Sequence, residues 1–93
     1  MREIPERDGY YIYILTCKDQ YFYCGWTTNL VQRYTMHFQG KGAKYTRAHP
    51  PIAITYWETF PDESSARKRE YEIKQMTRKQ KEALLYKESC VKE

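Results

Sequence analysis

The sequence contains few cysteines and no long apolar run. Its three cysteines are an odd number and show no C-x-x-C spacing, so we expect neither a disulfide framework nor a zinc site. No apolar run approaches the roughly 18 residues that a membrane helix requires, and we expect no membrane anchor and no secretion signal. These absences favour a protein of the reducing cytoplasm.

A strong charge of one sign is also missing, as are internal repeats and low-complexity segments. The 93 residues include 16 Lys and Arg against 12 Asp and Glu, which gives a formal net charge of +4. So mild an excess is compatible with a nucleic-acid partner and does not by itself indicate one. The length predicts a single domain over residues 9–87, with the charged ends 1–8 and 88–93 flexible.

Tyrosine, in contrast, is abundant, with ten in the chain and four in the stretch "YIYILTCKDQYFYCG". This stretch predicts two strands over residues 10–17 and 21–26, joined by a short hairpin loop at 18–20. With a loop of that length, Leu15 faces Tyr23 across the hairpin. Because side chains alternate along strands, four phenols are expected on one face. They are Tyr11, Tyr13, Tyr21 and Tyr23.

A helix is expected next, capped by one of residues 27–29 and ended by Gly40. Apolar residues that recur every four positions form its predicted buried stripe. They are Leu30, Tyr34 and Phe38. Arg33 and His37 are also four residues apart, and we expect them at the edge of this stripe.

The rest of the chain predicts a loop over 39–51, a strand over 52–59, a helix begun by Pro61-Asp62, and a last helix over 77–87 with a capping box. In the strand, alternation places Ile52, Ile54 and Tyr56 on one face. The element order is ββαβαα. The fold class is therefore α+β, with a small three-stranded sheet flanked by helices.

Glu70 is an unusual residue in the predicted second helix, because it falls on the same line as Ala66 and Ile73. A carboxylate on a packing face must be paired, protonated or bound to a metal. An ion pair with Arg33 or a lysine is the structural alternative to a metal site. Glu72 falls on another face and is expected to be solvated.

An ordered set of spaced residues resembles the GIY-YIG nuclease superfamily. The two strands carry Tyr11-Ile12-Tyr13 and Tyr23-Cys24-Gly25 where that family carries G-[IV]-Y and Y-[IV]-G. The segment "YCGWTTNLVQRYTMH" then supplies an arginine and a histidine four residues apart, and a later helix supplies one acidic residue. The "GKGAKYTR" loop and the "REYEIK" helix are similar to those of the small, stand-alone, single-domain bacterial branch.

The resemblance implies a metal-dependent nuclease that cleaves phosphodiester bonds in nucleic acid, with DNA favoured over RNA. Carried over by position, Tyr13 and Tyr23 would be the active-site phenols, and Arg33 would hold the scissile phosphate. His37 would be an auxiliary polar group near the phosphate. Glu70 would be the sole protein ligand of one divalent cation, Mg²⁺ or Mn²⁺.

These residue types suit that chemistry. A phenol is a poor base at its free pKa of ~10, but a neighbouring guanidinium and a cation favour the phenolate and lower that pKa. A hard cation such as Mg²⁺ can be held by one carboxylate together with waters and substrate oxygens. Two departures from the family pattern concern Trp26, where several members carry a lysine, and the late asparagine of many members, which this chain lacks.

The "GKGAKYTR" loop is a candidate contact for nucleic-acid phosphates. The glycines of "GKGAKYTR" allow the backbone to approach a phosphate, and Lys41, Lys44 and Arg47 can neutralise it. A solvated turn is the structural alternative for this loop.

The same fold could also be a non-catalytic DNA- or RNA-binding module, or a protein-interaction domain in which the site residues serve only as structure.

Overall fold

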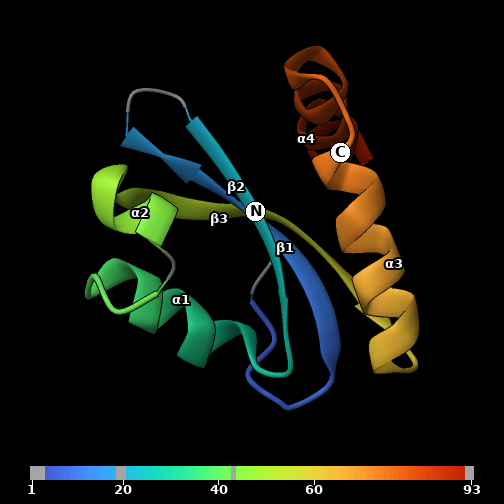
Figure 1. The fold of residues 1–93 in the computed structure, drawn as a ribbon. Helices are drawn as coiled ribbons and strands as arrows, with labels where there is room; N and C mark the ends of the chain where they lie inside the picture. Colours follow the sequence, from blue (N-terminus) through green and yellow to red (C-terminus); the bar gives the residue numbers. More distant parts are fainter. Residues whose placement is uncertain (1–3, 19–20, 43, 92–93) are drawn as a thin grey trace.

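A computed structural model describes residues 4–18, 21–42 and 44–91 of the chain (Figure 1). Its centre is a three-stranded antiparallel sheet of order β2-β1-β3, made of β1 (Tyr10–Cys17), β2 (Tyr21–Thr27) and β3 (Pro51–Phe60). All three predicted strands are confirmed, with β2 and β3 slightly longer than expected. Asp19 and Gln20 of the expected hairpin loop lie outside the described residues.

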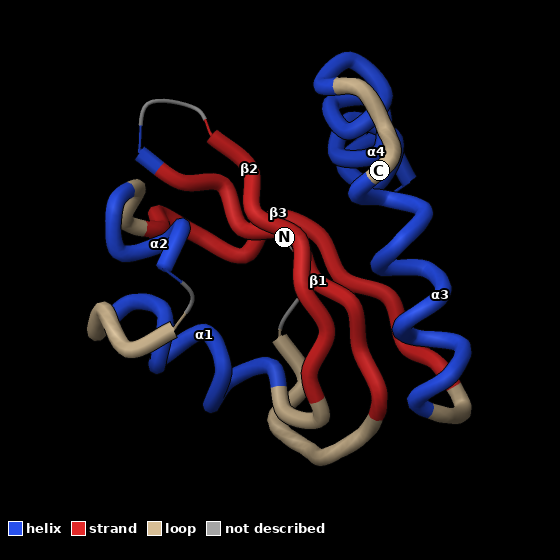
Figure 2. The backbone as a smooth tube through the Cα atoms, in the orientation of Figure 1, coloured by secondary structure: helices blue, strands red, loops and turns tan. Residues whose placement is uncertain are grey.

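Helices cover both faces of this sheet. Figures 1 and 2 show α1 (Leu30–Phe38) and α2 (Lys44–Ala48) on one side, and α3 (Glu63–Lys74) and α4 (Arg78–Val91) on the other. The expected order ββαβαα is confirmed, but the segment expected as a loop contains the short helix α2. The last helix also runs beyond the expected end near residue 87. In the described part of the chain, no helix is both long and apolar enough to cross a bilayer.

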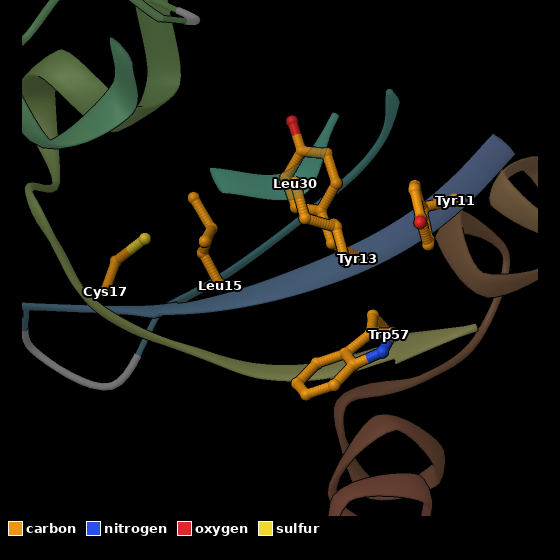
Figure 3. Close-up of a cluster of buried hydrophobic side chains, with 6 residues drawn as sticks. All are labelled: Tyr11, Tyr13, Leu15, Cys17, Leu30 and Trp57. Carbon is orange, nitrogen blue, oxygen red and sulfur yellow. The ribbon is translucent and has the colours of Figure 1, made fainter. Parts of the chain in front are cut away.

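Strand β1 is buried on both faces, and its alternating side chains divide the core into two. The α1-side core contains Tyr11, Tyr13, Leu15, Cys17, Leu30 and Trp57. Figure 3 shows four of these residues along β1, with Trp57 beside them on β3. The α3-side core contains Ile12, Ile14, Cys24, Tyr56, Ala66 and Ile73.

Strand β3 is irregular, and its side chains do not alternate as the sequence predicts. Ile14 pairs with Tyr56 but Leu15 pairs with Ile54, so that one residue of β3 is unpaired between them. A second shift leaves Ile52 unpaired, and this side chain is 63% exposed. The expectation that Ile52, Ile54 and Tyr56 share a face is therefore wrong, because each bulge inserts one extra residue and reverses the alternation.

Helix α1 begins and ends at the expected positions. The Asn29 side chain accepts a hydrogen bond from the Gln32 backbone N–H at 2.9 Å, which caps the start. At the other end Gly40 has φ +80°, and the Lys41 N–H reaches back to the Met36 carbonyl at 2.8 Å. This is a Schellman turn, which needs a left-handed residue and so favours glycine. The chain therefore turns sharply after α1 and returns toward it.

The buried stripe of α1 differs from the prediction at one residue. Phe38 is 67% exposed, whereas His37 is fully buried together with Leu30. Seven residues of α-helix fall only about 20° short of two complete turns. His37 therefore lies almost directly above Leu30, whereas Phe38 lies about 80° around the helix from Leu30.

The last two helices begin with side-chain caps. Asp62 accepts a hydrogen bond from the Ser65 backbone N–H at 2.8 Å. Thr77 and Gln80 form the predicted reciprocal capping box, with bonds of 2.9 and 3.2 Å. Met76, Leu84 and Leu85 then pack at the border of the α3-side core.

Two isoleucines provide a matched test of this architecture. Ile73 is a fully buried residue of α3, whereas Ile52 is exposed at a bulge of β3. Ile73→Ala should lower the free energy of unfolding by about 2–5 kcal/mol, because contacts are lost and a cavity remains. Ile52→Ala should change it by less than about 0.5 kcal/mol. Urea unfolding followed by circular dichroism measures both, and equal losses would contradict the bulged register.

Candidate active site

Two neighbouring strands place Tyr13 and Tyr23 on the same face of the sheet. Tyr23 pairs with Leu15, two positions along β1 from Tyr13, and the two phenol rings lie 6.3 Å apart between centroids. The residue opposite Tyr13 is Gly25, where a Cβ atom would lie 2.6 Å from the Tyr13 hydroxyl oxygen. The Tyr13 ring therefore lies across a position that only glycine leaves open, which explains the Y-x-G spacing physically.

Helix α1 brings His37 and Arg33 to these phenols. The His37 Nε2 atom lies 2.9 Å from the Tyr13 hydroxyl oxygen, and the imidazole centroid lies 5.2 Å from that of Tyr23. Arg33, one turn earlier on the helix, donates from Nε to the Tyr13 oxygen at 3.4 Å. Four of the predicted site residues thus form one contiguous cluster, which we call the phenol cluster: Tyr13, Tyr23, Arg33 and His37.

The other nitrogen of the imidazole contacts α2. His37 Nδ1 lies 2.8 Å from the hydroxyl oxygen of Thr46, which is only 1% exposed. The backbone of Gly42 also packs on the ring, because a Cβ atom there would overlap Nδ1. In the sequence this segment stands out by its glycines and basic residues, and no local pattern indicates Thr46 as a site residue.

Burial controls the protonation states in the phenol cluster. Desolvation, with a smaller contribution from the Arg33 charge, lowers the pKa of His37 to about 4. Desolvation also raises the pKa of Tyr13, against the opposing effect of the Arg33 hydrogen bond. The expected lowering of the phenol pKa is therefore outweighed by burial in the protein alone. At neutral pH the imidazole and the Tyr13 phenol are uncharged, and Arg33 is a cation.

Glu70 lies on α3, which covers the opposite face of the sheet (Figure 2). Its side chain is 20% exposed, and its Oε2 atom lies 3.1 Å from Lys74 Nζ. An ion pair with a lysine, one of the expected alternatives, is therefore present. Helix α3 contacts β2. Burial raises the pKa of the Cys24 thiol on β2 to about 12, the Glu70 charge adds to that rise, and the Lys74 charge opposes it.

Glu70 offers a single carboxylate to a cation. Among the described residues no group of three or more His, Cys, Asp or Glu side chains is placed to hold a metal ion. A cation at Glu70 would have this one carboxylate, with waters and substrate oxygens as its other ligands, an arrangement that Mg²⁺ accepts. Lys74 would have to release the carboxylate for such a cation to bind.

The remaining predicted residues lie on the surface around α2. Lys41, Lys44 and Arg47 are all exposed, so Thr46 points inward from a helix whose neighbouring basic residues point outward. Tyr21 is 44% exposed and its ring contacts that of His49, with centroids 4.1 Å apart. Trp26 packs against the α3-side core, on the opposite face from the phenols.

Comparison with known proteins gives consistent relatives. A family model described as the GIY-YIG catalytic domain matches residues 9–83. A UPF0213 protein of Clostridium perfringens is 47% identical over 83 residues, which cover 89% of this chain and 89% of that protein. A UPF0213 protein of Natronomonas pharaonis is 43% identical over 76 residues, which cover 82% of this chain and 89% of that protein.

Two solution NMR structures share the fold. A UPF0213 protein from Bacillus halodurans is 43% identical with a TM-score of 0.54, covering 83% of this chain and 82% of that one. A protein from E. faecalis is 40% identical with a TM-score of 0.61, covering 97% of this chain and 94% of that one. The resemblance based on the spaced tyrosine, arginine, histidine and glutamate residues is confirmed, and the chain belongs to the GIY-YIG catalytic domain family.

Proposed function

We propose that this protein is a metal-dependent nuclease that hydrolyses phosphodiester bonds in nucleic acid, with DNA as the favoured substrate. The observation that supports this most directly is the hydrogen-bonded chain from Arg33 through Tyr13 to His37. It combines a cation, a phenol and a neutral imidazole on one face of the sheet. Membership of a catalytic domain family with a nuclease-like fold supports the same function.

Arg33 is the group that would hold the scissile phosphate. A guanidinium carries five N–H donors, so its contact with Tyr13 leaves donors for phosphate oxygens. Hydrogen bonding to Tyr13 raises the pKa of Arg33, and its charge is therefore permanent. A fixed cation with paired donors matches the geometry and charge of a phosphodiester.

Tyr13 and His37 would move the proton of the attacking water. The Tyr13 phenol is neutral and can accept a proton only if its own proton leaves. His37 Nε2, 2.9 Å away on a neutral imidazole, is placed to accept it. As the water oxygen bonds to phosphorus and the bond to the leaving oxygen breaks, one water proton would pass to Tyr13 and the phenol proton to His37. Tyr23 would hydrogen-bond the phosphate or the water.

Glu70 would hold the divalent cation that members of this family typically use. When bound, such a cation supplies positive charge that stabilises the leaving oxygen. The carboxylate can supply one oxygen ligand once Lys74 releases it.

A non-catalytic nucleic-acid-binding module is the second candidate. The Glu70–Lys74 ion pair favours it, because a carboxylate that is already neutralised does not need a metal ion. The exposed basic residues of α2 would serve either function equally. Incubation of the purified protein with labelled single- and double-stranded DNA and RNA, with Mg²⁺ or Mn²⁺ and with chelator, separates the two.

The first prediction from the proposed function concerns the four phenols of the hairpin. Tyr→Phe deletes only the hydroxyl, so at Tyr13 or Tyr23 it should reduce single-turnover cleavage by about 10²–10⁴-fold, the usual contribution of a positioned acid or base. At Tyr11, whose hydroxyl donates to the Arg7 carbonyl, and at the half-exposed Tyr21, it should change cleavage less than threefold, roughly the scale of a fraction of a kcal/mol.

Thermal melts of the same four variants provide the control for folding. Tyr13→Phe should lower the free energy of unfolding by about 1–3 kcal/mol, because it leaves the buried His37 nitrogen unpaired. Substrate binding should persist, because Arg33 is unchanged. Cleavage at the wild-type rate by both Tyr13→Phe and Tyr23→Phe would exclude these phenols from catalysis.

The second prediction concerns the cation. Glu70→Gln should abolish metal-dependent cleavage and the thermal stabilisation produced by Mn²⁺, because a neutral amide is a much weaker ligand than a carboxylate. Glu72→Gln is the matched control, since Glu72 lies on the same helix with its side chain 62% exposed. If Glu70 serves only its ion pair with Lys74, the Gln variant will respond to Mn²⁺ as the wild type does.

The third prediction concerns nucleic-acid affinity. Neutralising Lys41, Lys44 and Arg47 together should reduce the slope of log K against log[salt] by roughly 2–3 units for duplex DNA, since each lost phosphate contact contributes about 0.9. A control variant that neutralises three exposed basic residues elsewhere removes the same net charge: Arg7, Lys68 and Lys79. Equal slopes in the two triple variants would mean that α2 is not the contact surface.

A further inference from the structure

Thr46, to which the mechanism above assigns no role, is buried against the imidazole of His37. We propose that Thr46 is a positioning residue that holds the His37 proton on Nδ1, so that Nε2 is free to accept the proton of Tyr13. The effect on turnover rests on the proposed function. The tautomer itself is a property of the folded protein and can be measured without any substrate.

The hydrogen bonds of the cluster permit two proton arrangements. A neutral imidazole has one N–H donor and one acceptor nitrogen. In the first arrangement Tyr13 donates to Nε2, and Nδ1–H donates to the Thr46 hydroxyl oxygen. In the second, Thr46 donates to Nδ1, and Nε2–H donates to the Tyr13 oxygen. Both are compatible with the distances of 2.9 and 2.8 Å.

Arg33 favours the first arrangement. Its Nε–H already donates to the Tyr13 oxygen, and the positive charge makes the phenol a stronger donor. In the second arrangement this oxygen would accept from Arg33 and from His37, and the phenol would need a third partner for its own proton inside the core, where Tyr13 is 2% exposed. In the first arrangement the phenol donates its proton to His37 Nε2 and needs no further partner.

Thr46 is suited to the acceptor role. A hydroxyl oxygen has two lone pairs, so it can accept Nδ1–H while its own hydrogen is donated to another group. The orientation of the ring is restricted too, because the Gly42 backbone packs directly on Nδ1. The ring is therefore held by a packed backbone on one side and by Thr46 and Tyr13 at its two nitrogens.

Helix α2 thus has one side that faces solvent and another that faces the imidazole of His37. Lys44 and Arg47 of α2 face solvent, where they can contact phosphates, and Thr46 between them faces the imidazole. The contact that packs α2 against α1 is therefore the same contact that sets the His37 tautomer.

The test compares Thr46→Val, which keeps the shape and removes the hydroxyl, with Thr46→Ser, which keeps the hydroxyl. Long-range ¹H–¹⁵N correlation spectra of histidine-labelled protein identify which nitrogen carries the proton. Wild type and Thr46→Ser should both show a pyrrole-like Nδ1 and a pyridine-like Nε2. Thr46→Val should shift the population toward Nε2–H. Thr55→Val, at an exposed threonine of β3, is the matched control and should leave the His37 spectrum unchanged.

Turnover provides the second measurement. Thr46→Val should lower kcat at least tenfold with little change in KM, and Thr46→Ser should restore it; where a catalytic histidine is held in the wrong tautomer, losses reach about 10⁴-fold. An Nε2–H tautomer in the wild type would overturn the proposal, even if Thr46→Val fails to fold. So would a Thr46→Val protein with unchanged spectrum and kcat. If wild type shows Nδ1–H but never cleaves, the proposed function fails while the tautomer assignment stands.

Discussion

The buried hydrogen bond between Tyr13 and His37 is the interaction on which the candidate site depends. It joins the central strand to α1 inside the core, where an unpaired polar atom would cost about 1–3 kcal/mol. The same two side chains then bind Arg33 and Thr46, so that β1, α1 and α2 are positioned by one continuous polar chain. Every buried side-chain nitrogen and oxygen in the described residues has a hydrogen-bond partner. Such a fully satisfied network specifies one geometry and resists rearrangement.

Close packing against glycine makes this network possible. Gly25 leaves room for the Tyr13 ring on the neighbouring strand, and Gly42 allows the backbone to lie against His37. Gly40 adopts the left-handed conformation that turns the chain back after α1. The glycines of the two family motifs therefore act through packing and chain direction, and they determine where the polar atoms meet.

Local signals account for what could be predicted from the sequence. Strand alternation and a short loop gave the β1–β2 register, and the caps at Asn29 and Thr77 fixed two helix starts. The bulges of β3 and the burial of His37 in place of Phe38 depend on tertiary packing, which local periodicity does not encode. Residue spacing and the family resemblance together predicted the members of the phenol cluster. Thr46 was missed because one inward residue in a single helical turn produces no periodic pattern.

The sheet separates two parts of the candidate site that differ in electrostatics. On the α1 side, the polar chain is complete and carries the positive charge of Arg33. On the α3 side, Glu70 is neutralised by Lys74 near β2. Under the proposed function, exchange of the Lys74 ammonium for a hydrated cation would keep this carboxylate neutralised. The pKa of Lys74 is lowered by burial, but the hydrogen bond and the charge of Glu70 outweigh that effect and raise it, so the exchange would remove the group that now stabilises the ammonium. The exchange would thus raise the net positive charge of the protein by that of the bound cation, and the cation and an anionic substrate would favour each other's binding.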